Sequence, residues 1–106
     1  MNDTLKAILA ELRGRFKDLY GERLVQMILF GSQARGDAEP GSDIDVLVVL
    51  RGEVSPCEEI AKTIDDVAEV SLHHNEVVSC VFISEEQFER ERSPLLLNVR
   101  REGVPV

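Results

Sequence analysis

The sequence predicts an α/β domain in which a small mixed sheet of three or more strands is flanked by helices. Two short runs of apolar, β-compatible residues, 24–30 and 44–50, have the composition of buried strands. Longer segments with apolar residues at every third or fourth position predict amphipathic helices around them. The 106 residues fit a single domain, 1–106, and are too few for a second hydrophobic core.

The first predicted element is a helix over residues 4–20. Asp3 is its predicted N-cap, because the side chain can accept a hydrogen bond from a free N–H group of the first turn, and Gly21 is its predicted end. The apolar residues recur at steps of three and four and mark one face of the helix: Leu5, Ile8, Leu9, Leu12, Phe16 and Leu19.

The first two predicted strands, 24–30 and 44–50, are separated by a short helix and a loop. Residues 32–38 can form one or two helical turns, and residues 39–42, with the sequence Glu-Pro-Gly-Ser, have the composition of a loop. This order places a helical turn directly after the first strand.

A second long helix is predicted to begin after the N-cap Ser55, with Pro56 at its first position and Glu58 at its third. It should end near His73 and His74, which we expect to interact favourably with the helix dipole. Its predicted apolar face consists of Ile60, Ala61, Ile64, Val67, Ala68 and Leu72.

The remaining elements are a third strand over 76–83 and two short helices. The first helix should open at Ser84 and the second at Ser93, with Gly103 as the end of the second. The expected order alternates helices and strands, as in a layered α/β structure.

Composition and charge exclude several classes of partner. Twelve basic and twenty acidic residues give a formal charge of −8, which repels a phosphate backbone, so direct nucleic-acid binding is not expected. No apolar run can span a bilayer, and residues 1–16 lack the apolar core of a secretory signal, so we expect a cytoplasmic protein. Cys57 and Cys80 lack a CxxC spacing and are expected to be small buried side chains, with no disulfide and no zinc.

The residues that carry chemistry lie around the first two strands. Gly31 and Ser32 follow a strand and open a helical turn, where backbone N–H groups and a hydroxyl can bind a phosphate. Asp43 and Asp45 are two residues apart at the start of a strand, so both carboxylates lie on one face. Two such carboxylates repel each other unless a cation lies between them, and oxygen ligands suit Mg²⁺. A phosphate site facing a metal site is what phosphoryl or nucleotidyl transfer requires.

These residues resemble a known signature. Gly31-Ser32-x-Ala34-Arg35-Gly36, followed by Ser42-Asp43-Ile44-Asp45, is similar to the motif of the DNA polymerase β-like nucleotidyltransferase superfamily, and of its minimal nucleotidyltransferase (MNT) branch in particular. The resemblance implies the polymerase β-like fold, with one or two Mg²⁺ bound by Asp43 and Asp45 as catalytic residues and ATP as co-substrate. The implied nucleotide-binding residues are Gly31, Ser32, Arg35, Gly36 and Ser42.

The chain departs from this family on the third strand, where active members carry another carboxylate that helps to bind the metal or to activate the attacking hydroxyl. The corresponding residue here is Ser79. If the crossover from the second strand to the third is right-handed, these strands are parallel. Glu76, at the start of the third strand, then lies near Asp43 and can substitute as a catalytic carboxylate; the alternative is that Glu76 is merely solvent-exposed.

Arg35 has an alternative of its own. It can be a structural partner of Asp37 or Asp43 rather than a phosphate ligand.

Two functions stay open at this point. The resemblance implies transfer of a nucleoside monophosphate, AMP from ATP, to a hydroxyl of a partner protein, with the chain acting as the antitoxin of a HEPN/MNT toxin–antitoxin pair. The alternative is a catalytically reduced member, with Ser79 in place of the third carboxylate, that acts as a binding antitoxin or as a nucleotide-binding regulatory subunit. In either case a HEPN-type protein or a second copy of the chain is expected to complete the acceptor site.

Overall fold

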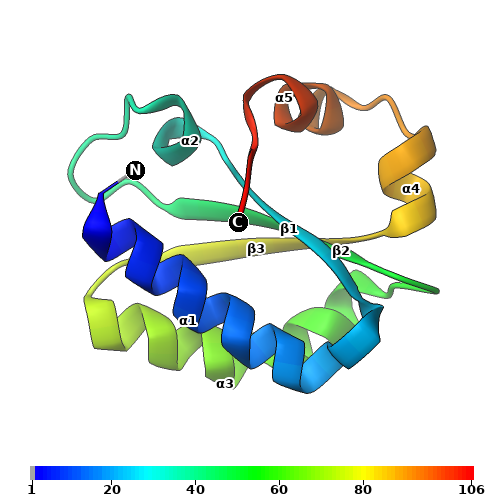
Figure 1. Cartoon of the computed structure of the whole chain (residues 1–106), viewed down its shortest axis with the longest axis horizontal. Helices are drawn as coiled ribbons and strands as arrows, with labels where there is room; N and C mark the ends of the chain where they lie inside the picture. The colour runs from blue at the N-terminus through cyan, green and yellow to red at the C-terminus, as the bar shows by residue number, and fades with distance from the viewer. Residues whose placement is uncertain (1) are drawn as a thin grey trace.

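The structure, a computed structural model, describes residues 2–106 and contains one mixed sheet with the strand order β3-β2-β1-β4 (Figure 1). β1 is antiparallel to β2 and to β4, whereas β2 and β3 are parallel. The mixed sheet predicted from the sequence is therefore confirmed. The strands are β1 (Leu24–Phe30), β2 (Ile44–Leu50), β3 (Val78–Ser84) and β4 (Val104–Pro105).

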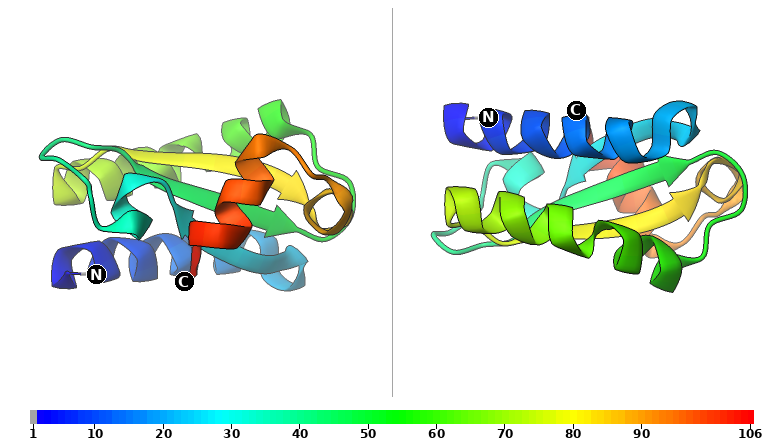
Figure 2. Two further views of the ribbon diagram at one scale, coloured as in Figure 1. Left: turned by 90° about the horizontal axis from the view of Figure 1, so that it is seen from above. Right: turned by 90° about the horizontal axis from the view of Figure 1, so that it is seen from below.

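Helices lie on both faces of this sheet (Figure 2). The long helices α1 and α3 cover one face, while α2 and α5 lie over the other and α4 closes one end. The bounds are α1 (Asp3–Tyr20), the 3₁₀ turn η1 (Gly21–Arg23), α2 (Ser32–Arg35), α3 (Pro56–His74), α4 (Glu85–Arg90) and α5 (Pro94–Glu102).

The hydrophobic core has two parts, one on each face of the sheet. The larger part includes Ile44 and Val46 and packs under α1, whereas Leu47 and Val49 belong to the smaller part under α5. Because side chains alternate along a strand, Asp45 shares its face with Leu47 and Val49. The fold thus directs this carboxylate towards the α2 and α5 side.

The second half of the chain follows most of the local sequence signals. The hydroxyls of Ser84 and Ser93 cap α4 and α5, accepting hydrogen bonds from the N–H groups of Gln87 and Leu96. β3 begins at Val78, two residues later than predicted, because residues 75–77 form the connection that turns the chain from α3 into the sheet.

The start and end of α1 differ from the prediction. Asn2 is the N-cap, with its Oδ1 accepting a hydrogen bond from the N–H of Leu5 at 2.7 Å, and Asp3 is already helical. At the other end Tyr20 is buried and Leu19 is exposed. Tyr20 follows Phe16 by one helical turn and packs edge-on against its ring, with the centroids 6.2 Å apart, so the aromatic pair decides which side is buried.

The predicted apolar face of α3 is wrong except at Val67, which is partly buried and packs against the core. Ile60, Ile64 and Leu72 are exposed, and the side buried against α1 and the sheet consists of Glu59, Thr63 and Val70. Glu59 is buried with a partner, because the hydroxyl of Tyr20 donates to its Oε1 at 3.0 Å, and Lys62 lies 3.6 Å from the same oxygen. Because two of the buried positions are polar residues, the apolar periodicity of the sequence does not reveal which face of α3 is buried.

β4 was not predicted from the sequence. It is only two residues long, Val104 and Pro105, and adds to the free edge of β1 opposite Ile28 and Leu29. A two-residue strand that contains proline carries no periodic signal, so only the tertiary structure reveals it. Within residues 2–106, none of the helices combines the length and hydrophobicity needed to span a membrane.

Candidate functional site

Gly31 forms the turn at which β1 ends and α2 begins. Its φ of 77° and ψ of −157° lie in a region that residues with a side chain rarely adopt. Its carbonyl accepts the N–H groups of Ala34 and Arg35, both at 3.1 Å, and these are the first bonds of the helix. The N–H groups of Ser32 and Gln33 precede them and so have no intrahelical partner. The turn can therefore direct N–H donors towards an anion.

Asp45 lies directly against this turn. A Cβ atom placed on Gly31 would be 2.6 Å from Oδ2 of Asp45, well inside any normal contact. Glycine is therefore required for the close approach of the carboxylate as well as for the backbone conformation. The two halves of the sequence motif meet at this point of the structure.

The two carboxylates of the motif have different surroundings. Asp43 is exposed in the loop before β2, whereas Asp45 is half-buried in the strand itself. Burial raises the pKa of Asp45, and the nearby negative charge of Asp43 raises it further. A bound cation would offset both effects, so this pair has the electrostatics of a metal site.

The other predicted nucleotide-binding residues shape the loops around this point. Gly36 ends α2 in the left-handed conformation, with φ of 82°, and its N–H donates to the carbonyl of Ser32 at 3.0 Å. The hydroxyl of Ser42 accepts the N–H of Glu39 at 3.0 Å and so closes the loop before Asp43. Ser42 therefore has a structural role in this loop that is independent of nucleotide binding.

Arg35 is held by two carboxylates. Its Nε lies 3.1 Å from Asp37 and its Nη1 lies 3.3 Å from Glu102 at the end of α5, and these neighbours raise the pKa of Arg35. The pair with Asp37 is the structural alternative considered from the sequence. Glu102 was missed, because nothing in the local sequence connects the end of α5 to α2.

The structure places Ser79 and Glu76 differently relative to Asp45. Ser79 is the register partner of Asp45 in the parallel ladder of β2 and β3, so the two side chains share a face. Glu76 lines a cavity of about 200 Å³ whose other residues include Leu5 and Ile8 of α1, Gln33 of α2 and Ile44 at the start of β2. Glu76 therefore lies between the start of α1 and the motif residues, whereas Ser79 stands directly beside Asp45 in the ladder.

A large cavity of about 920 Å³ lies away from the two aspartates, where β1 begins and β2 and β3 end. Its lining includes five glutamates, Glu53, Glu58, Glu59, Glu85 and Glu86, against two basic residues, Arg23 and Lys62. Because this excess of negative charge repels a triphosphate, size alone does not make it the nucleotide site.

The two cysteines are free and differ in exposure. Cys80 in β3 is largely shielded from solvent, and burial raises the pKa of its thiol to about 12. Cys57 is exposed, which corrects the expectation that both are buried, because the first turn of α3 presents this position to solvent.

Comparison with known proteins now adds to the geometry. Residues 9–100 match the nucleotidyltransferase domain family. The chain belongs to this family. The family inferred from the Gly-Ser and Asp-x-Asp motifs is therefore confirmed, and nucleotidyl transfer is the class of enzyme reaction that membership indicates.

Two relatives from Methanocaldococcus jannaschii are both named as proposed protein adenylyltransferases. MJ0604 is 36% identical over 81 residues, which cover 76% of this chain and 75% of the relative. MJ0141 is 33% identical over 72 residues, which cover 68% of this chain and 72% of the relative.

Solved structures share the fold at lower identity. A chain of a toxin–antitoxin complex crystallised with AMP-PNP has a TM-score of 0.61 and 19% identity, covering 89% of this chain and 68% of that chain. A chain of the toxin–antitoxin pair MntA–HpeT has a TM-score of 0.61 and 18% identity, covering 99% of this chain and 71% of that chain. At this level of identity the similarity shows the fold.

Proposed function

We propose that this nucleotidyltransferase transfers AMP from ATP to a hydroxyl of a partner protein, as the antitoxin of a toxin–antitoxin pair whose toxin is of the HEPN type. The observation that carries the proposal is the contact between the Gly31 turn and the Asp45 carboxylate. It joins a phosphate-binding turn to a pair of metal-binding carboxylates, which are the two sites that nucleotidyl transfer needs.

Asp43 and Asp45 are the residues that would hold Mg²⁺. Their mutual repulsion and the raised pKa of Asp45 favour a bound cation, and their oxygen ligands match the preference of Mg²⁺. A metal bound there would neutralise charge on the triphosphate. An MntA–HpeT structure was solved with two aspartates, separated by one residue, replaced by glutamate, which draws attention to the same spacing in that relative.

Gly31 and Ser32 would bind the phosphates through the N–H groups of the turn, with Gly36 setting the path of the chain after it. In the proposed reaction the acceptor oxygen bonds to the α-phosphorus of ATP while the bond from that phosphorus to the β-phosphate bridge breaks. Pyrophosphate leaves, the hydroxyl proton passes to solvent, and AMP remains on the acceptor.

The acceptor is proposed to be a protein because the relatives named as protein adenylyltransferases cover most of this chain. An apolar surface suited to a partner lies along the edge strand β3, on the face of the sheet that α3 covers and opposite to the face that carries Asp45. It consists of Ile60 and Ile64 of α3 with Ser79 and Cys80 of the edge strand β3, which together line a cavity of about 220 Å³. We call this the α3–β3 surface; Ile60 and Ile64 are each about half exposed there.

The test is transfer of label from α-phosphate-labelled ATP, with Mg²⁺, in a lysate of cells that carry the natural partner. The Asp43→Ala/Asp45→Ala variant should lose all transfer. The matched control is Asp18→Ala/Asp65→Ala, which removes the same charge from exposed helix positions and should label the partner normally. Equal labelling by both variants would contradict the proposed site.

The partner surface has its own test. Ile60→Glu/Ile64→Glu should abolish labelling and capture of the partner, while binding of ATP with Mg²⁺ stays unchanged. Leu19→Glu, at an exposed leucine of α1, is the control and should leave labelling unchanged. If the Ile60→Glu/Ile64→Glu variant labels its partner normally, the partner docks elsewhere.

A second candidate function is favoured by Ser79. This residue stands beside Asp45 in the ladder, at the position where the family pattern places the third carboxylate, and a hydroxyl cannot accept the acceptor proton as a carboxylate does. A chain that binds nucleotide without turnover would then neutralise its partner by contact. Nucleotide binding without transfer, together with tight capture of the partner, would favour this second function.

A further inference from the structure

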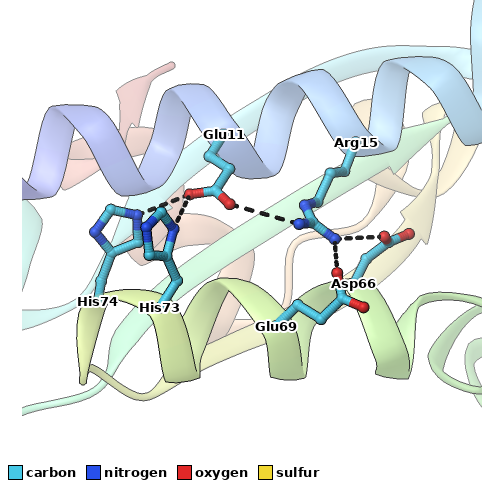
Figure 3. Close-up of polar contacts among 6 residues, drawn as sticks. All are labelled: Glu11, Arg15, Asp66, Glu69, His73 and His74. Atoms are coloured by element: carbon cyan, nitrogen blue, oxygen red, sulfur yellow. Dashed lines mark hydrogen bonds and ion pairs between the residues drawn. The ribbon is translucent and has the colours of Figure 1, made fainter.

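A polar cluster between α1 and α3 is separate from the nucleotide site and has no role in the proposed function (Figure 3). Glu11 projects from α1 towards the last turn of α3, where His73 and His74 point back at it. Oε2 of Glu11 lies 3.3 Å from Nδ1 of His73 and 2.7 Å from Nε2 of His74. One carboxylate oxygen therefore meets two imidazole nitrogens.

We propose that Glu11, His73 and His74 form a binding site for a divalent transition-metal ion of the zinc type. The three potential ligand atoms all lie within 4.8 Å of one another, and they come from two helices that are far apart in the sequence. Two imidazoles and one carboxylate are a ligand set that zinc uses in proteins, with a further position left for water.

The distances fit a metal with little rearrangement. Bonds of about 2.0–2.2 Å in a tetrahedral site place ligand atoms roughly 3.3 Å apart. The separation of Glu11 and His73 already has this value, and that of Glu11 and His74 needs to open by about 0.6 Å. The two histidine nitrogens lie within 4.8 Å of each other. His73 is exposed, so its ring can adjust without disturbing the core.

A second layer of contacts fixes the orientation of Glu11. Its other oxygen, Oε1, lies 3.6 Å from Arg15 one turn along α1, and Arg15 is itself held by Asp66 and Glu69 of α3 (Figure 3). This network leaves Oε2 directed at the histidines. Such support is typical of metal ligands, because it holds a carboxylate in its binding geometry before the ion arrives.

The local charge also suits a cation. Glu11, Asp66 and Glu69 carry three negative charges against the single positive charge of Arg15, while the histidines contribute none when neutral. The last turn of α3 adds the partial negative charge of its carbonyl groups. A divalent cation at this point is therefore attracted by the net negative charge of its surroundings. It would also link α1 to α3.

The test is isothermal titration calorimetry of the purified chain with ZnCl₂ at pH 7.5. We expect one ion per chain, with His73→Ala and His74→Ala each weakening the affinity by about tenfold or more. Cobalt(II) should give visible absorption bands at the same stoichiometry, and saturating zinc should raise the Tm by about 5 °C or more through linkage. Circular dichroism of each variant without metal checks that the fold is kept.

Two control variants separate this site from the other candidate ligands of the chain. Cys57→Ser removes the exposed thiol, and Asp43→Ala/Asp45→Ala removes the nucleotide-site carboxylates; both should bind zinc as the parent does. The inference is overturned if binding is not saturable, if it survives in His73→Ala/His74→Ala, or if one ion bridges two chains. None of these outcomes depends on nucleotide transfer, so they test the zinc site without testing the proposed function.

Discussion

The α-carbon of Gly31 and the carboxylate of Asp45 are in such close contact that a Cβ at position 31 would lie 2.6 Å from Oδ2. This contact couples the turn after β1 to the start of β2. The geometry of the proposed phosphate-binding turn and that of the proposed metal ligand are therefore set together, and a change at either residue should disturb both.

Gly31→Ala should destabilise the fold by more than about 3 kcal/mol, because it combines backbone strain with a clash against Asp45. Gly36→Ala should cost less, about 1–2 kcal/mol, because Gly36 has the left-handed helical conformation and no atom lies within 4 Å of the added methyl group. The contact itself is isolated by making Gly31→Ala in the Asp45→Ala background, where the loss should be smaller than in the parent. Urea unfolding measures these losses, and an equal loss in both backgrounds would show that the Asp45 contact contributes nothing.

Asp45→Asn should raise the thermal stability near pH 7 while it removes Mg²⁺ binding. The folded state raises the pKa of Asp45, first by burial and then through the charge of Asp43, so the folded protein holds this proton more tightly than the unfolded chain. The stability that protonated Asp45 contributes is therefore lost as the pH rises through the pKa of Asp45 in the folded protein. The asparagine side chain does not ionise and avoids this loss.

Melting curves from pH 3 to pH 8 check the sign of this effect. The gain in Tm of Asp45→Asn over the parent should be largest at neutral pH and should shrink as the solution is acidified and Asp45 becomes protonated. A gain that does not change with pH would show that charge is not the cause.

Ser79→Asp should increase AMP transfer by roughly tenfold or more, because it places a carboxylate beside Asp45 where the family pattern expects one. Position 79 is exposed, so the new charge does not have to be buried. Glu76→Gln serves as the comparison and should leave transfer nearly unchanged, since Glu76 precedes β3 and Ser79, not Glu76, is the register partner of Asp45. A large loss in Glu76→Gln would identify it as the missing carboxylate.

Tyr20→Phe should destabilise the fold by about 1–3 kcal/mol, since it removes the hydroxyl that donates to buried Glu59 and leaves that carboxylate with fewer partners. Burial of the ring raises the pKa of Tyr20, and the same bond to Glu59 raises it further. Tyr20→Phe/Glu59→Leu should recover part of the loss, because no polar group then remains unpaired. Chemical denaturation of the three proteins tests this, and an equal or larger loss in the double variant would argue against it.

Local signals in the sequence predict β1 and β2 with their observed limits, and they predict the capping of α4 and α5 by Ser84 and Ser93. Gly31, Asp43 and Asp45 can be proposed as site residues from the sequence, because glycine turns and alternating carboxylates have direct geometric meanings. These features depend on few residues that are close in sequence.

The features that the sequence did not reveal depend on distant contacts. Glu59 is buried on α3 because Tyr20 of another helix bonds to it. Glu102 joins Arg35 only after α5 has packed on the sheet, and Glu11 meets His73 only after α1 has packed against α3. No pattern of period two or three to four can encode such pairs.

β3 forms the outer edge of the sheet next to β2 and carries Ser79 one strand away from Asp45. Its outward row of backbone N–H and C=O groups is open to an added strand. A short extended peptide that pairs with this edge would lie about 10 Å from Asp45, which is two strand spacings.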